Sequence, residues 1–214
     1  MDDIKYAIIT AAGTGSRLGM NIPKCLVSVN HKKLIDYQLE LLAHMQEIRI
    51  VVGYMKNEVM NYVGKRYSNV VFIENPDFLT TAASKSIYLA THDLTCKHII
   101  ISGDLLINPN SFHHFLLSCN EQDGIVGICP SRTEHAIYAQ LDSENNVIAF
   151  DRHTQTNFEW CGIAYLNKFK IADSKYYFFE ELNHHLPLPS AIIDCYEVDT
   201  PMDLNLAINQ YCWT

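Results

Sequence analysis

The first 24 residues constrain the fold and chemistry of this chain more than any other segment. An apolar strand from Tyr6 to Thr10 runs into the loop Ala11-Ala12-Gly13-Thr14-Gly15-Ser16-Arg17-Leu18-Gly19, and Pro23-Lys24 follows. Because glycine lacks a Cβ atom, the backbone at Gly13 and Gly15 can take positive φ angles and present N–H groups to a ligand. Arg17 and Lys24 add two cations suited to phosphate oxygens. The segment predicts a phosphate-binding loop, with an ordinary glycine turn and two solvated cations as the alternative.

Two common nucleotide-binding motifs do not fit this loop. A Walker A loop needs Gly, four residues and then Gly-Lys-Ser/Thr, but the fifth residue after Gly13 is Leu18 and the fifth after Gly15 is Met20. The dinucleotide fingerprint needs Gly or Ala three residues after its second glycine, where Leu18 stands. These mismatches argue against a P-loop ATPase and leave a dinucleotide-binding oxidoreductase as a weak alternative.

Composition and charge further restrict the class of protein and its possible partners. The chain has 214 residues, of which 48% are apolar and 19% charged, as in ordinary globular proteins. Its formal charge of -8 and the lack of a basic stripe argue against a nucleic-acid partner. The longest apolar runs have strand length, so no membrane helix is expected. The acidic start Met1-Asp2-Asp3 is unlike a signal peptide, and the seven scattered cysteines without a Cys-x-x-Cys motif predict a reduced, cytoplasmic protein.

Strands and helices alternate through the first 120 residues. After the opening strand, the pattern predicts strands at 47–53, 70–73 and 98–102 and helices at 56–66, 81–91 and 110–118. This order predicts an α/β fold with a mostly parallel, Rossmann-like central sheet covered by helices on both faces. Ligands of such sheets bind beyond the carboxyl ends of the strands.

The second part of the chain has a different pattern. Strands are expected at 124–129, 137–141, 147–151, 161–166 and 195–198, with helices at 175–184 and 201–211 and a break at 186–189. Close spacing of the strands predicts a small antiparallel portion. Thr200 is expected to cap the last helix, with Pro201 in its first turn and Asp203 as the third helical residue. No linker or repeat divides residues 1–214, so a single domain is predicted.

Two aspartates follow apolar strands at positions where a ligand would lie. Asp104 comes after the strand at 98–102, and Asp199 follows the strand at 195–198. Alone, each is equally well explained as a turn residue or a helix cap. Mg²⁺ is bound by one or two carboxylates together with substrate phosphates, so this pair, facing a phosphate-binding loop, predicts a Mg²⁺ site.

These residues together resemble the nucleotidyltransferase family that makes sugar nucleotides and CDP-alcohols. The matching motifs are Ala11-Ala12-Gly13-x-Gly15-x-Arg17-Leu18, Pro23-Lys24, Gly103-Asp104 and Glu197-Val198-Asp199. Within the family, the chain is most similar to the small phosphocholine cytidylyltransferase type, through Val52-Gly53-Tyr54, Asn75-Pro76-Asp77-Phe78, Thr81, Ser86-Ile87-Tyr88-Leu89 and Thr200-Pro201-x-Asp203-Leu204. The resemblance implies a glycosyltransferase-A-like fold with a nucleotide-binding half at 1–120 and an acceptor-binding half at 121–214.

The resemblance also implies a role for each of these residues. Ala11, Ala12 and Gly13 would contact the base and sugar, while Gly15, Ser16 and Arg17 hold the β and γ phosphates. Lys24 would reach the α phosphate and act with Arg17 as a catalytic cation, and Asp104 and Asp199 would bind Mg²⁺. The remaining expected nucleotide contacts are Thr14, Gly53, Thr81 and Ser86. An ionised acceptor phosphate needs no general base, since its second pKa is about 6, so no catalytic histidine is expected.

The acceptor site departs from the family pattern. A paired asparagine of the phosphocholine type is replaced by Ala82-Ala83, and Lys85 brings a cation that suggests a more anionic acceptor, although a solvated lysine explains it equally well. Choline recognition would need an aromatic cage, to which Trp160 could contribute. The expected acceptor-binding residues are Lys85, Glu159, Trp160, Gly162 and Glu180.

The function predicted first is a Mg²⁺-dependent nucleotidyltransferase, with CTP and a small phosphate or phosphonate acceptor as substrates. It would release pyrophosphate and serve surface polysaccharide or lipid decoration. Uridylyl, guanylyl or thymidylyl transfer to a sugar 1-phosphate is the nearest alternative. A non-catalytic nucleotide sensor is the next, and its expected sign, loss of Lys24 or of either aspartate, is not seen. The sequence leaves the acceptor and the oligomeric state open.

Overall fold

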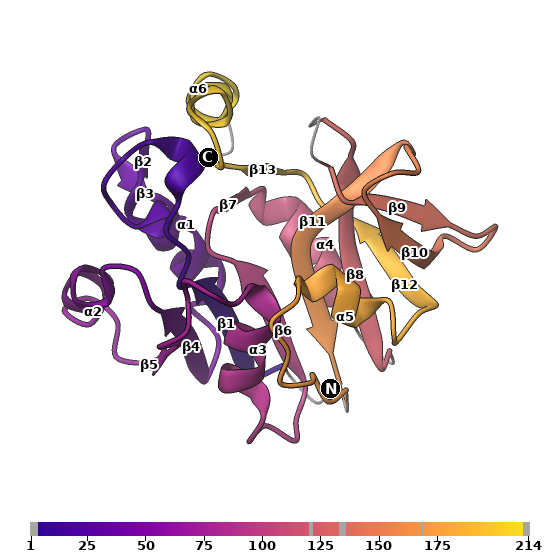
Figure 1. The fold of residues 1–214 in the computed structure, drawn as a ribbon, viewed down its shortest axis with the longest axis horizontal. Helices are drawn as coiled ribbons and strands as arrows, with labels where there is room; N and C mark the ends of the chain where they lie inside the picture. The colour runs from indigo at the N-terminus through magenta and orange to yellow at the C-terminus, as the bar shows by residue number, and fades with distance from the viewer. Residues whose placement is uncertain (1–3, 120–121, 133–135, 168, 212–214) are drawn as a thin grey trace.

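The protein folds around one large mixed sheet. The structure, a computed structural model, describes residues 4–119, 122–132, 136–167 and 169–211. Cys212 and the acidic start at 1–3, both used in the sequence analysis, lie outside the described residues. Within these ranges, nine strands form the sheet in the order β5-β4-β1-β6-β11-β8-β12-β10-β9 (Figure 1). They are β1 (Tyr6–Ala11), β4 (Glu47–Val52), β5 (Val70–Glu74), β6 (His98–Ser102), β8 (Gly124–Pro130), β9 (Tyr138–Leu141), β10 (Asn146–Asp151), β11 (Phe158–Leu166) and β12 (Leu188–Ile192).

The sheet has a parallel and a mainly antiparallel part. Strands β5, β4, β1 and β6 are parallel, as the strand and helix alternation predicts. Strand β11 then pairs antiparallel with both β6 and β8, and only β8 and β12 are parallel beyond it among the described strands. The predicted break at 186–189 is wrong in its second half, because Leu188 and Pro189 pair with β10 as the start of β12. The α/β class is confirmed, with an antiparallel part larger than expected.

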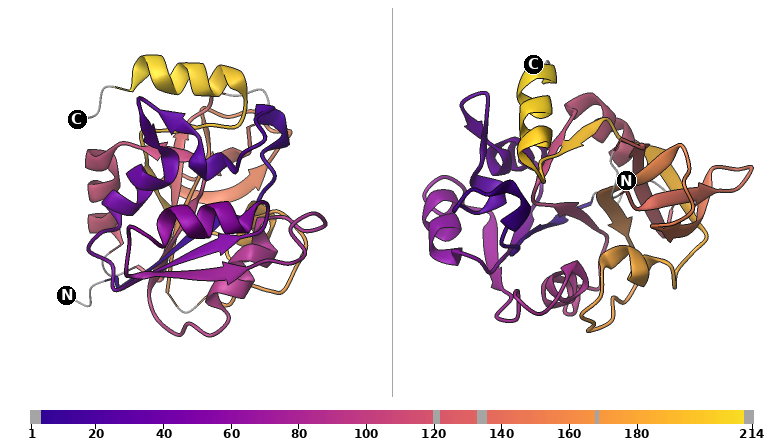
Figure 2. Two further views of the ribbon diagram at one scale, coloured as in Figure 1. Left: turned by 90° about the vertical axis from the view of Figure 1, so that its left-hand side faces the viewer. Right: turned by 45° about the horizontal axis from the view of Figure 1, so that its top comes forward.

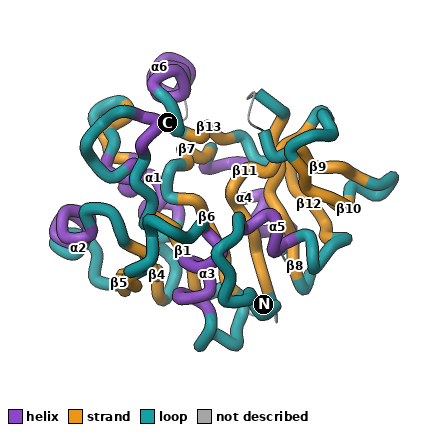
Figure 3. The backbone as a smooth tube through the Cα atoms, viewed as in Figure 1, coloured by secondary structure: helices purple, strands orange, loops and turns teal. Residues whose placement is uncertain are grey.

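Helices cover both faces of the sheet. Along β1, Ile9 faces the core formed with α1 (Leu34–Leu41), α2 (Lys56–Val63) and α4 (Pro109–Ser118). The preceding residue, Ile8, faces the other core, formed with α3 (Ala83–Thr91) and α5 (Phe178–Leu182). Figure 1 shows α3 and α5 in front of the sheet and α4 behind it, and the same alternation of purple helices and orange strands is seen in Figure 3. None of the helices in the described ranges is long and apolar enough to cross a bilayer.

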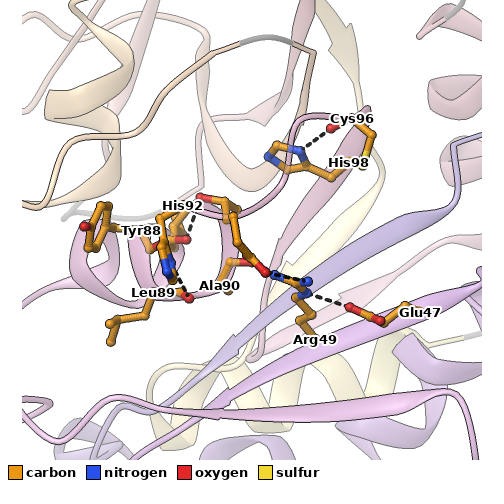
Figure 4. Close-up of polar contacts among 11 residues, drawn as sticks. Glu47, Arg49, Tyr88, Leu89, Ala90, His92, Cys96 and His98 are labelled. Atoms are coloured by element: carbon orange, nitrogen blue, oxygen red, sulfur yellow. Dashed lines mark hydrogen bonds and ion pairs between the residues drawn. The ribbon is translucent and has the colours of Figure 1, made fainter.

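Arg49 fixes helix α3 against the sheet. From β4, its guanidinium donates to the carbonyl of Ala90 at 2.8 Å and pairs with Glu47 at 2.6 Å and with Asp93 (Figure 4). Burial lowers the pKa of Arg49, but the hydrogen bonds and charges of Asp93 and Glu47 outweigh this and leave the pKa raised. The guanidinium therefore stays charged and holds the C-terminal end of α3 in place.

Two small sheets complete the fold. Strand β7 (Leu105–Ile107) pairs antiparallel with β13 (Cys195–Glu197), and β2 (Ser28–Val29) forms a hairpin with β3 (Lys32–Lys33). Helix α6 (Pro201–Gln210) packs over this hairpin (Figure 2). The predicted cap of α6 is confirmed, since the Thr200 hydroxyl accepts from Asp203 N and the Asp203 carboxylate accepts from Thr200 N. The sequence did not predict β2, β3 and β7, since strands of two or three residues leave little periodic signal.

Candidate active site

The glycine loop follows β1 and brings Lys24 close to its own backbone. Gly15 takes a φ of 62° and begins the 3₁₀ turn at Ser16–Leu18. A Cβ added to Gly15 would lie 2.7 Å from Cγ of Lys24, so the site needs glycine here both for its backbone conformation and for the approach of Lys24. Gly13 differs from expectation, because its φ is not positive and an added Cβ would meet nothing within 4 Å.

The ends of β1 and β6 place Asp104 beside the loop. Thr10 and Ser102 are partners at the carboxyl ends of these parallel strands. The next residue, Gly103, donates its N–H to the Thr10 carbonyl at 3.0 Å, and an added Cβ would lie 2.7 Å from that oxygen. Only glycine permits this close approach, which directs the chain so that Asp104 follows at the mouth of the loop.

The pairing of β7 with β13 brings the distant carboxylates together. Glu197 is the partner of Leu105, and the N–H of Val198 donates to the Asp104 carbonyl at 2.9 Å. One carboxylate oxygen from each of Asp104, Glu197 and Asp199 lies within 4.8 Å of the others. A strand pair only three residues long therefore assembles an acidic cluster from segments about 95 residues apart in the chain.

Cations neutralise part of this acidic cluster. Nζ of Lys24 lies 3.1 Å from Oδ2 of Asp104 and makes a shorter contact with Asp199, and the Arg17 guanidinium lies 2.5 Å from the other oxygen of Asp199. Burial lowers the pKa of Lys24, but the charge of Asp104 and the contact with Asp199 outweigh it, and the pKa is raised. Lys24 is therefore charged at neutral pH.

Glu197 completes the acidic cluster. Although the side chain is open to solvent through a cavity, the protein packed around the carboxyl group and the charges of Asp104 and Asp199 raise its pKa to about 8. Crowded carboxylates of this kind are relieved by a divalent cation, and hard oxygen ligands suit Mg²⁺ or Ca²⁺. The donor set therefore fits a divalent metal ion.

Two cavities meet at this cluster. The small cavity, of about 240 Å³, is bounded by the glycine loop, Lys24 and the two aspartates. The large cavity, of about 860 Å³, extends from Glu197 and Asp199 toward α3, β11 and α5. Thr10, Arg17 and Asp199 line both. A ligand in the small cavity would therefore lie next to one in the large cavity.

The structure brings most of the predicted nucleotide-binding residues to the small cavity. Those lining it are Ala11, Gly13, Thr14, Gly15, Ser16, Arg17 and Lys24, and the predicted metal ligands Asp104 and Asp199 line it as well. Ala12 and Gly53 do not line it: the Ala12 carbonyl accepts from Tyr54 N, and a Cβ added to Gly53 would lie 2.8 Å from that carbonyl oxygen. Thr81 and Ser86 line neither cavity, and both accept from the side-chain amide of the buried Asn75.

The predicted acceptor-binding residues separate into two groups. Glu159, Trp160 and Gly162 line the large cavity, where Gly162 has a φ of 82° at an irregularity in the pairing of β11. Lys85 does not line it, because its ammonium group is held by both carboxylate oxygens of Asp173, at 2.7 and 2.9 Å. Glu180 does not line it either, and its carboxylate caps α5 by accepting from Tyr177 N.

Sequence reasoning missed several residues of the site. Glu197 stands two positions before Asp199, and its place beside a predicted metal ligand is the signal that could have marked it. Arg132 and Arg152 also line the large cavity. Both follow strands in the irregular second half of the chain, where no motif distinguishes them from surface arginines.

Comparison with known proteins identifies the family. The model of the MobA-like NTP transferase domain matches residues 7–157, which include the glycine loop, Lys24 and Asp104. The chain belongs to this family. The match ends before Glu197 and Asp199. The place of these two carboxylates in the acidic cluster is therefore shown by the pairing of β13 with β7 and not by the family match.

Several of the curated relatives are cytidylyltransferases. The choline-phosphate cytidylyltransferase of Streptococcus pneumoniae is 37% identical over 115 residues, or 51% of this chain and 49% of the relative. The CTP:phosphoglutamine cytidylyltransferase of Campylobacter jejuni is 35% identical over 136 residues, or 61% and 51%. The matched part of the chain spans about half the length of these relatives.

Solved structures share the fold over nearly the whole chain. The CTP:phosphocholine cytidylyltransferase of S. pneumoniae superposes with a TM-score of 0.79 and 21% identity, covering 96% of this chain and 99% of its own. The inositol-1-phosphate CTP transferase of T. maritima gives a TM-score of 0.77 and 18% identity, covering 97% of each chain. The nucleotidyltransferase fold is therefore confirmed for the chain as a whole.

Proposed function

We propose that this protein is a Mg²⁺-dependent cytidylyltransferase that couples CTP to a small phosphorylated or phosphonate acceptor and releases pyrophosphate. The observation that carries the proposal is the convergence of Lys24, Arg17 and three carboxylates at the junction of two cavities. A triphosphate in the small cavity and an acceptor phosphate in the large one would meet at this junction. A site of this kind suits phosphoryl transfer, which depends mainly on positioning and charge neutralisation.

The glycine loop and its cations would hold the triphosphate. Residues 13–16 line the small cavity, where backbone N–H groups of this loop would bind the β and γ phosphates. The Arg17 guanidinium would contact these phosphates in exchange for Asp199, and Lys24 would contact the α phosphate. An acceptor oxygen attacks the α phosphorus in line, and pyrophosphate leaves on the opposite side.

The acidic cluster would bind the metal ion. Asp104, Glu197 and Asp199 supply carboxylate oxygens, and when bound, Mg²⁺ would neutralise charge on the triphosphate and on the leaving pyrophosphate. Before the triphosphate binds, Lys24 and Arg17 balance the charge of Asp104 and Asp199. The acceptor phosphate is already ionised at neutral pH, so no general base is required of the chain.

The relatives support CTP and a small acceptor. Their names include enzymes for choline phosphate, phosphoglutamine and 2-aminoethylphosphonate. Bifunctional GlmU proteins, at 25% identity over 127 residues and 35% over 71, are further matches. Cytidylyl transfer is therefore favoured over nucleotidyl transfer to a sugar 1-phosphate. A cytoplasmic enzyme that serves surface polysaccharide or lipid decoration stays our prediction.

Pyrophosphate release tests the proposal. The purified protein is incubated with Mg²⁺, each of CTP, UTP, GTP and dTTP, and a panel of phosphorylated amines, amino acids, phosphonates and sugars. CTP should give release with at least one non-sugar acceptor, and chelation of the metal should stop it. Release only with UTP, GTP or dTTP and a sugar 1-phosphate would favour the alternative, and no release with any pair would contradict catalysis.

A further inference from the structure

A glutamine is buried behind the turn that carries Asp104. Gln38 belongs to α1 and is fully buried, with 0% of its surface exposed. Its side-chain Nε2 donates to the carbonyl of Ser102 and to that of Leu105, each at 2.9 Å. Ser102 ends β6 and Leu105 begins β7, so the two hydrogen bonds join both sides of the turn at 103–104. One side chain from α1 therefore bridges the segment that places Asp104.

Backbone contacts hold the same turn on two other sides. The N–H of Gly103 donates to the Thr10 carbonyl at 3.0 Å, and the N–H of Val198 donates to the Asp104 carbonyl at 2.9 Å. Both contacts are made by main-chain groups, which a substitution leaves in place. Gln38 holds the turn through its side chain, so its contribution can be removed and measured.

The amide group of Gln38 uses its donors but not its acceptor. Both neighbours of the group are carbonyl oxygens, so its NH₂ end faces them. Its Oε1 is buried and, among the described residues, has no hydrogen-bond partner. A buried acceptor without a partner lowers stability, and an apolar side chain of similar size would avoid this cost. Local features that lower stability are expected where a residue serves a functional site.

The position of Asp104 is important for the acidic cluster. One of its carboxylate oxygens lies within 4.8 Å of oxygens from Glu197 and Asp199. Mg²⁺ needs its ligand oxygens at about 2.0–2.1 Å in near-ideal octahedral geometry, so a small shift of one ligand weakens binding. A turn that is free to move would therefore bind the metal ion less tightly, even with all three carboxylates present.

We propose that Gln38 is a positioning residue that fixes the turn at 102–105 and thereby holds Asp104 where it binds the metal ion. The inference rests on the proposed function for the role of Asp104 as a metal ligand. Gln38 lines neither cavity, so it acts through Asp104 and not by contact with a substrate. Groups that support a metal ligand from behind typically contribute about 10- to 100-fold to metal affinity.

Metal titration of the full chain tests this inference. Mn²⁺, which takes the same oxygen ligands as Mg²⁺, is titrated into the unaltered protein and into Gln38→Met. Free Mn²⁺ is measured by electron paramagnetic resonance, with and without a CTP analogue whose α,β bridge is methylene. Gln38→Met keeps the approximate size of the side chain but removes both donors. Its Mn²⁺ affinity should fall about tenfold or more.

A double substitution shows whether Gln38 acts through Asp104. Asp104→Asn should itself weaken Mn²⁺ binding, which then depends on Glu197 and Asp199. Adding Gln38→Met to Asp104→Asn should lower the affinity no further, because residues that act through one another are not additive. A merely structural role would instead give the same loss in both backgrounds.

An amide elsewhere in the fold provides the matched control. The side chain of Asn69 also donates to a backbone carbonyl, that of Met45 at 3.0 Å, but lines neither cavity. Asn69→Leu should therefore leave the Mn²⁺ affinity unchanged. Circular dichroism and urea denaturation establish that each variant is folded under the conditions of the titration.

A second variant at the same position keeps the shape of the side chain. Burial favours the neutral form of the carboxyl group in Gln38→Glu, which then has one donor in place of two. Its Mn²⁺ affinity should lie between those of the unaltered protein and Gln38→Met.

The possible results separate this inference from the proposed function. Unchanged Mn²⁺ affinity in a folded Gln38→Met overturns the inference, as does an equal loss in the Asp104→Asn background or failure of both Gln38 variants to fold. Normal binding by Asp104→Asn, or no binding by the unaltered protein, removes the proposed metal site and the inference with it. If Gln38→Met weakens binding through Asp104 but no triphosphate yields pyrophosphate, the proposed function fails while the positioning role stands.

Discussion

The two cavities meet at Thr10, Arg17 and Asp199, yet they are built in different ways. The small cavity is formed largely by one continuous segment, 10–17, with Lys24 and the two aspartates added. The large cavity draws its wall from α3, β6, β11, α5 and the segment before α6. Ion pairs cross the first, whereas the second combines aromatic side chains with arginines and carboxylates. A local motif therefore specifies the proposed donor site, whereas tertiary packing specifies the acceptor site.

Removal of the Lys24 charge should lower catalysis far more than it weakens acceptor binding in the large cavity, and this is the largest effect that we expect. Lys24→Met keeps the length of the side chain but removes the charge that contacts Asp104 and Asp199. We expect kcat to fall by about 10²- to 10³-fold, the usual loss when one preorganised electrostatic contact to the transition state is removed. Steady-state pyrophosphate release measures this loss, and acceptor binding in the large cavity should change much less.

A lysine outside both cavities controls for charge removal. Lys33→Met also removes a partly buried ammonium, one that donates to the Leu26 carbonyl at 2.7 Å. It should leave kcat within about twofold of the unaltered protein, as expected of a residue away from the reacting groups. A Lys24→Met protein with near-normal kcat would remove this residue from the proposed mechanism.

Alanine substitutions at three glycines of the loop should destabilise the protein to different degrees. Gly15 and Gly19 have φ angles of 62° and 70°, but only at Gly15 would a Cβ collide with Lys24. The Ala substitution at Gly19 should cost about 1–2 kcal/mol of unfolding free energy, from the left-handed backbone alone. Gly15→Ala should cost more and also lower kcat, because Lys24 must move. Gly13→Ala should be the least destabilising, since its backbone and surroundings accept a Cβ.

Urea denaturation orders the three glycine variants. The expected order of stability is Gly13→Ala, then Gly19→Ala, then Gly15→Ala as the least stable. If Gly15→Ala and Gly19→Ala are equally stable and equally active, the contact between Gly15 and Lys24 has no energetic importance, and the loop is constrained by its backbone alone.

The contrast between a cavity built from a local motif and one built by tertiary packing explains which parts of the site the sequence could predict. The parallel strands, the glycine loop, Lys24 and the two aspartates leave local signals, because hydrophobic runs and fixed spacings are properties of short segments. The pairing of β7 with β13 leaves no such signal, since each strand has three residues and the partners are about 90 positions apart. The contribution of Glu197 to the acidic cluster therefore became visible only in three dimensions.

The acceptor side was less predictable for a related reason. Glu159, Trp160 and Gly162 share strand β11 and line one cavity, and their role in acceptor binding stays a prediction. Lys85 was expected to face the acceptor, but Asp173 holds its ammonium group from 88 positions away in the chain. Charge pairing of this kind is not encoded by residue type or spacing.

Loss of a helix cap should have a smaller effect, and only one of two caps should affect the site. Thr200→Ala removes the hydroxyl that caps α6 directly after Asp199, and Asn108→Ala removes the side chain that caps α4. Each should cost about 1 kcal/mol of unfolding free energy. Only Thr200→Ala should also lower kcat or weaken metal binding, because Asp203, its capping partner, also accepts from the N–H of Asp199. Equal activity of the two variants would show that Asp199 is positioned by its ion pairs alone.

Glu197 lines the large cavity and belongs to the acidic cluster, and its substitution should give the smallest effect. The surrounding protein and the charges of Asp104 and Asp199 raise its pKa from 4.5 to about 8, so the folded state holds this proton more tightly than the unfolded state. The resulting stability is present in full below pH 4.5 and is lost as the pH rises through about 8. Glu197→Gln should flatten this decline in urea denaturation without metal, although contact with solvent keeps the effect small. If the stability of Glu197→Gln still declines in the same way with rising pH, the proton is held by Asp104 or Asp199 and not by Glu197.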